Sequence, residues 1–60
     1  MSENKQTNLI FKLTRPAKSK GGDRYEATVQ GDIMSIYLPQ SISRVGGQPA
    51  QSVNITITPQ

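Results

Sequence analysis

The residues of this chain that could do chemistry are its charged side chains, and most of the positive ones lie in one stretch. Residues 12–24 hold five basic residues against one acidic residue, a net charge of +4. The other positions hold two basic and three acidic residues, a net of −1, so the overall charge of +3 comes from this stretch. Lysines and arginines on a loop between two strands are suited to contacts with a phosphate backbone. The basic residues are Lys12, Arg15, Lys18, Lys20 and Arg24.

Two further residues extend this candidate site. Tyr37 falls at an outward position of a predicted strand, where its ring could stack on a nucleic-acid base. Arg44 adds a cation after a short helical turn that we expect to follow that strand. We therefore predict binding of DNA or RNA through the seven residues Lys12, Arg15, Lys18, Lys20, Arg24, Tyr37 and Arg44. An alternative stays open, because lysine-rich loops also keep small β domains soluble and discourage edge-to-edge pairing.

The composition argues against catalysis. The chain has no histidine and no cysteine, so it lacks the commonest general base, the thiol nucleophile and the usual transition-metal ligands. Its acidic residues fall in the N-terminal tail, at turns and on an outward strand face, where we interpret them as solvating and turn residues. These are Glu3, Asp23, Glu26 and Asp32. We predict that the protein is not an enzyme and uses no cofactor or metal.

The elements that would position the candidate site are strands. Four stretches, 8–14, 23–30, 33–38 and 52–58, alternate apolar and polar residues with the period of two that is typical of half-buried strands. Pro39 ends the third, and Leu38, Ile42 and Val45 are spaced for one side of a short helical turn. We predict an all-β fold, a small single-domain barrel or sandwich (SH3-like or related) of four to five short strands with one short helical turn. Residues 1–7 should form a disordered tail, and 8–60 the domain.

The same alternation predicts the core and the connections. Gly31-Asp32 is expected to form the tight turn between the second and third strands. The loop Arg15–Gly22 has no large apolar side chain to anchor it, so we expect it to be mobile. The apolar residues at inward positions, expected to form the core, are Leu9, Phe11, Leu13, Tyr25, Ala27, Val29, Met34, Ile36, Leu38, Ile42, Val45, Val53, Ile55 and Ile57.

The small size of the chain predicts self-association. A domain of 60 residues buries only about 60% of its unfolded surface, and no disulfide or thiolate metal site can reinforce this one. We expect a homo-oligomer, most simply a dimer, that buries a strand edge, such as Ser52–Thr58, or a face of the sheet against another copy. No apolar run is long enough for a membrane span, and we expect a cytoplasmic protein. A protein-interaction or structural subunit that self-associates through a strand edge is thus the alternative to a nucleic-acid-binding protein.

Overall fold

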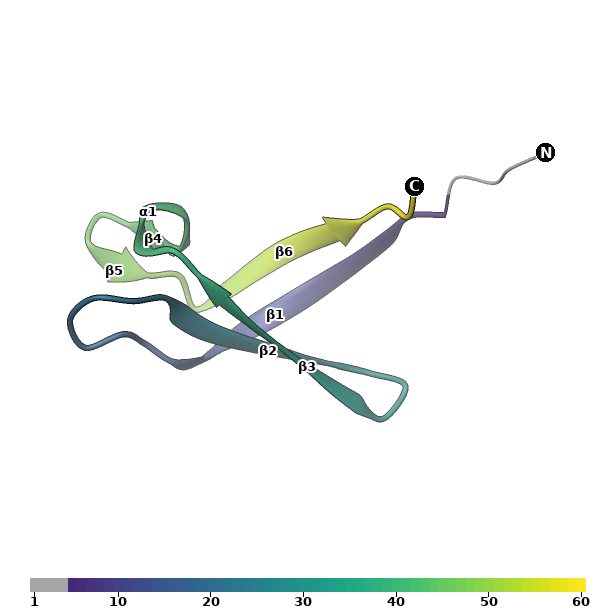
Figure 1. The fold of residues 1–60 in the computed structure, drawn as a ribbon, viewed down its shortest axis with the longest axis horizontal. Helices are drawn as coiled ribbons and strands as arrows, with labels where there is room; N and C mark the ends of the chain where they lie inside the picture. The colour runs from purple at the N-terminus through teal and green to yellow at the C-terminus, as the bar shows by residue number, and fades with distance from the viewer. Residues whose placement is uncertain (1–4) are drawn as a thin grey trace.

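The main element of the protein is a four-stranded antiparallel sheet, seen in a computed structural model that describes residues 5–60 (Figure 1). A short helical turn and a small hairpin follow the third strand. None of the helices in residues 5–60 is long and apolar enough to cross a membrane. The sheet contains, in the spatial order β3-β2-β1-β6, strands β1 (Thr7–Arg15), β2 (Asp23–Val29), β3 (Asp32–Leu38) and β6 (Ser52–Ile57). The helical turn is α1 (Gln40–Ser43), and the hairpin pairs β4 (Arg44–Val45) with β5 (Gln48–Pro49).

The fold is small and mostly β, as the sequence predicts, but the sheet stays open. Strands β3 and β6 occupy its two edges and do not pair with each other, so the described residues form no closed barrel. The β4–β5 hairpin forms a second sheet of only two-residue strands, which is too small for the second layer of a sandwich. Residues 1–4 of the predicted tail lie outside the described residues, and Thr7 already belongs to β1.

The alternating pattern separates an apolar face of the sheet from a mostly polar one, on which Ile10 and Ile33 are exposed. Phe11, Tyr25 and Ala27 are the buried apolar residues. Seven half-buried side chains of the predicted core pack against them: Leu9, Leu13, Met34, Ile36, Leu38, Val53 and Ile55. Three predicted core residues are wrong, because Ile42 is 67% exposed, Val45 is 79% exposed and Ile57 is 40% exposed. The helical turn ends at Ser43 and the chain then continues as a strand, so helical spacing does not extend to position 45.

The turn between β2 and β3 lies one residue earlier than predicted. Gln30 and Gly31 form it, and Asp32 already belongs to β3. Both turn residues have positive φ, 49° at Gln30 and 86° at Gly31, as the tight turns of hairpins require. Glycine adopts this conformation without strain, which explains why the reversal occurs here.

The pairing of β1 with β2 is short and divides the molecule into two ends. It joins three residue pairs, Lys12 with Glu26, Leu13 with Tyr25 and Arg15 with Arg24, with an irregularity between Leu13 and Arg15. Beyond these pairs the strands diverge into a β1–β6 arm and a β2–β3 arm, and Figure 1 shows the opening between them. We call this side the open end. The closed end holds the β1–β2 pairs, the loop of residues 16–22, α1 and the β4–β5 hairpin.

Candidate nucleic-acid interface

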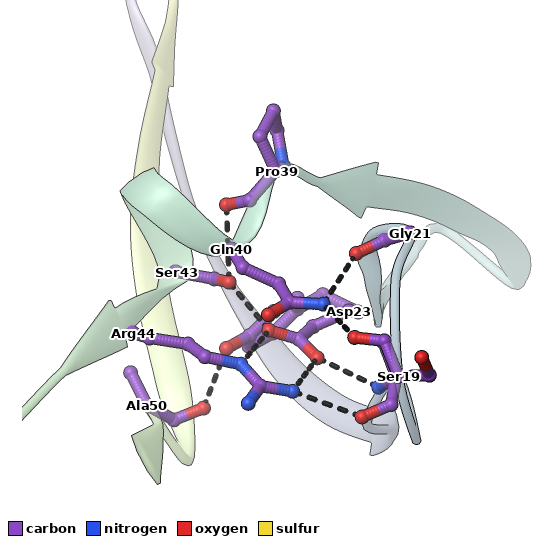
Figure 2. Close-up of polar contacts among 10 residues, drawn as sticks. Ser19, Gly21, Asp23, Pro39, Gln40, Ser43, Arg44 and Ala50 are labelled. Atoms are coloured by element: carbon purple, nitrogen blue, oxygen red, sulfur yellow. Dashed lines mark hydrogen bonds and ion pairs between the residues drawn. The ribbon is translucent and has the colours of Figure 1, made fainter. Parts of the chain in front are cut away.

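The loop that carries the central lysines is held by a buried carboxylate at its C-terminal side. Asp23 begins β2 and is 0% exposed. Its Oδ1 accepts hydrogen bonds from the Ala17 N–H at 2.7 Å and from Arg44 Nη2 at 3.0 Å. Its Oδ2 accepts from Ser43 Oγ at 2.6 Å and from Arg44 Nε at 3.1 Å, as Figure 2 shows. One side chain therefore joins the loop, α1 and β4.

These contacts set the charge state of Asp23. Hydrogen bonds from Arg44, Ser43 and Ala17 all favour the ionised form, and together they hold the pKa of the Asp23 carboxyl far below its usual range. The same hydrogen bond with Asp23 raises the pKa of Arg44. The interpretation of Asp23 as a solvating turn residue is therefore wrong: it forms a bidentate ion pair at the closed end.

Further hydrogen bonds fix the backbone of the loop. Arg44 Nη2 donates to the Ala17 carbonyl at 3.0 Å. Gln40 Nε2, from the first residue of α1, donates to the carbonyls of Ser19 at 2.8 Å and Gly21 at 3.0 Å (Figure 2). The loop that composition describes as unanchored thus has polar anchors. Sequence reasoning did not identify Ser43 or Gln40.

The hairpin that follows α1 is tied to the sheet by a tyrosine. Tyr25 Oη donates a hydrogen bond of 2.7 Å to the carbonyl of Ala50, just after β5. The pKa of Tyr25 is raised, first because the ring is removed from water and second because the negative Asp23 lies nearby. The neutral hydroxyl is therefore the favoured donor in the folded protein.

Tyr37 lies on the outer face beside the loop. It is 65% exposed and sits opposite Arg24 in the β2–β3 register, so its outward position is confirmed. Two open hollows adjoin its ring. The first is lined by Ser19, Lys20, Gly21, Gly22, Tyr37, Pro39 and Gln40, and the second by Arg15, Pro16, Ala17, Lys18, Lys20, Gly22 and Tyr37.

Gly22 allows this close arrangement. A Cβ atom at position 22 would lie 3.0 Å from the Leu38 carbonyl oxygen and 3.2 Å from Tyr37 Cβ. The neighbouring strand could accommodate it only by shifting, because the nearer of these atoms is backbone. The absence of a side chain at Gly22 therefore lets the loop pass directly beside Tyr37, between the two hollows.

The predicted cations fall into two groups. Lys12, Arg15, Lys18 and Lys20 are exposed, and none of them forms an ion pair within residues 5–60. Arg24 instead pairs with Glu26 at 2.9 Å and donates to Ser35 Oγ at 3.3 Å. Arg44 is occupied by Asp23 and Ala17, so we assign it a structural role. The structure thus brings Arg15, Lys18, Lys20 and Tyr37 together around the hollows, while Lys12 lies farther along β1.

Comparison of the chain with protein-family models, with curated proteins and with solved structures gives no significant match. The described residues also contain no cluster of three or more histidine, cysteine or acidic side chains that could hold a metal ion.

Proposed function

We propose that the protein binds single-stranded nucleic acid, and does so without catalysis, at the surface formed by Tyr37, Arg15, Lys18 and Lys20. The observation that carries the proposal is the exposed Tyr37 ring between two hollows that share Lys20. An aromatic platform next to free cations is the combination with which proteins hold single strands. A base stacks on the ring, and the lysine and arginine side chains contact phosphates on either side of it.

The anchoring of the loop supports this assignment. A flexible loop has to be ordered when it binds, and ordering costs affinity. Here Asp23, Gln40 and Arg44 already hold the backbone of residues 17–21. The entropy cost of binding therefore comes mainly from ordering the lysine side chains. Arg24 and Arg44 stabilise the fold and do not contact the nucleic acid directly, because each is paired with an acidic residue within the fold.

A single strand suits the surface better than a duplex. The bases of a duplex are stacked on one another and cannot reach a tyrosine that projects from a sheet, whereas unpaired bases can. One tyrosine and three cations predict modest affinity with little sequence preference. Affinity should fall with salt, since each phosphate contact releases a counterion.

The test is a fluorescence-anisotropy titration with labelled oligo(dT) and oligo(U), and with a duplex for comparison, at 50 and 200 mM salt. Tyr37→Ala should weaken single-strand binding by roughly 5- to 150-fold, the equivalent of about 1–3 kcal/mol of stacking. Lys20→Glu should also weaken it and should reduce the slope of log affinity against log salt by about 0.7 per lost contact.

Two matched controls isolate the site. Lys5→Glu changes the net charge as much as Lys20→Glu does, but it lies two residues before β1, on the side where Thr7 pairs with Ile57 and away from the loop. Ile33→Ala truncates another exposed residue of β3 far from the loop. Both should bind like the wild type. The proposal fails if wild-type protein shows no binding tighter than millimolar at 50 mM salt, or if Lys5→Glu and Lys20→Glu lose affinity equally.

A further inference from the structure

The apolar face of the sheet is not covered at the open end. Leu9, Met34 and Ile55 are only half-buried there, and they pack against the buried core from one side. Val29 and Ile57 continue the inward positions of β2 and β6 toward the tips of the arms, outside the core cluster. Ile57 is 40% exposed. All five side chains are apolar, so each arm presents apolar side chains to water on its inner face.

The total solvent-accessible surface of the chain indicates how much area a partner would cover. A folded monomer of 6.6 kDa is expected to expose about 3,900 Å². This chain exposes 4918 Å². The excess of about 1,000 Å² is close to the roughly 800 Å² that each partner loses in a standard protein–protein interface. One interface of ordinary size would remove most of this excess, which is summed over all 60 residues, including the four outside the described part.

We propose that two copies of this chain form a homodimer by packing the apolar faces of their open ends against each other about a two-fold axis. Charge favours a second copy as the occupant. Each chain carries a net charge of +3, but the free cations lie in the loop and on the outer face. Among the strand residues of the two arms, the one charged residue at an inward position is Asp32, which is exposed at the tip of β3 opposite Val29. Two positive chains therefore meet there with little repulsion. A two-fold interface also requires one self-complementary patch, which a mainly apolar face provides.

The diverging strands also expose backbone N–H and C=O groups that can form hydrogen bonds across the same interface. Residues 7–11 of β1 pair only with β6, and residues 27–29 of β2 pair only with β3. The two strand edges that border the opening are thus available to a second chain, which removes unpaired edges. This surface differs from the β6 edge, which the sequence suggests as one example of a self-associating edge, and corresponds to the alternative of a buried face. Two open sheets packed face to face would form the two-layered fold that one chain lacks. The dimer is independent of the proposed nucleic-acid site.

The test is sedimentation velocity between about 1 and 300 µM, with Val29→Glu as the variant and Thr28→Glu as its control. The two substitutions add the same charge to neighbouring positions of β2, but Val29 faces inward and Thr28 is on the outer face. We expect the wild type and Thr28→Glu to dimerise, and Val29→Glu to raise the dissociation constant at least about tenfold, because each dimer would bury two unpaired carboxylates. A dimer unaffected by Val29→Glu would overturn the proposed surface.

A second variant and a second measurement keep the proposal testable if Val29→Glu does not fold. Ile57→Glu places the same charge at the tip of the other arm and should dissociate the dimer in the same way. For the wild type, the melting temperature should rise with protein concentration, because the association stabilises only the folded state. A monomer at 300 µM with a concentration-independent melting temperature would overturn the dimer itself.

Discussion

The closed and open ends of the molecule are stabilised by different kinds of interaction. At the closed end, Asp23 binds Arg44, Ser43 and the backbone of Ala17, and Tyr25 binds Ala50. At the open end the inward positions are mostly apolar, with Thr7 and Asp32 at the tips of the two arms. Hydrogen bonds are directional and fix one geometry, whereas apolar contact is non-directional and requires only that water be excluded. The closed end is therefore complete within one chain, whereas we propose that a second copy completes the open end.

The largest effect should come from breaking the ion pair of the closed end. Asp23→Asn keeps the shape of the side chain but leaves the half-buried Arg44 guanidinium without an anion. We expect the melting temperature to fall by at least about 10 °C, measured by circular dichroism. The control is Asp32→Asn, at an exposed position next to the β2–β3 turn, which should change it by less than about 3 °C. Equal effects of the two variants would contradict the structural role of Asp23.

The Asp23 ion pair at the closed end predicts how the stability of the protein depends on pH. The pKa of Asp23 is depressed in the folded protein, so its contribution is fully present above the unfolded value near 3.8 and is lost as the pH falls below it. We expect the urea midpoint to stay level from pH 7 to about pH 5 and to decline from about pH 4 downward. In Asp23→Asn most of this decline should disappear. A variant that loses stability with acid as steeply as the wild type would show that other carboxylates cause the effect.

The smallest effect should come from two residues that the sequence assigns to the core. Ile42 and Val45 are exposed beside the closed end, so Ile42→Ser and Val45→Ser should each change the free energy of unfolding by no more than about 0.5 kcal/mol. Urea denaturation at a fixed protein concentration measures this. By comparison, Phe11→Ala in the true core should cost about 3–5 kcal/mol. A loss above about 2 kcal/mol at position 42 would mean that a partner covers α1.

Alternation of residues identified much of the fold because each strand has one buried face. The inward positions of Phe11 and Tyr25 and the outward position of Tyr37 follow directly from the period of two. The pattern also contained a signal for Asp23. This residue shares the inward parity of Tyr25 and Ala27, so a charged residue at that position requires a buried partner.

The partner itself could not be found from the sequence. Arg44 lies 21 residues away, across β3 and α1, and no local pattern connects the two positions. The anchoring of the loop by Gln40 is equally non-local. The helical turn α1 has only four residues, so it ends before the helical spacing of Leu38, Ile42 and Val45 could place Val45 on the same side. Local periodicity therefore predicts the strands and their faces, while the contacts that position the candidate site depend on tertiary structure.

The pairing of β1 with β6 has a consequence for the order of folding. Strands β2 and β3 are joined by a two-residue turn, so their pairing closes almost no loop. In contrast, the β1–β6 pairing brings Lys12 to Ser52 and Thr7 to Ile57, which requires most of the chain to be closed into one loop. The entropy cost of closure grows with loop length, and contacts distant in sequence slow folding. We expect the β2–β3 hairpin to form first and β6 to join last, and β6 to be the strand that detaches most readily from the native sheet.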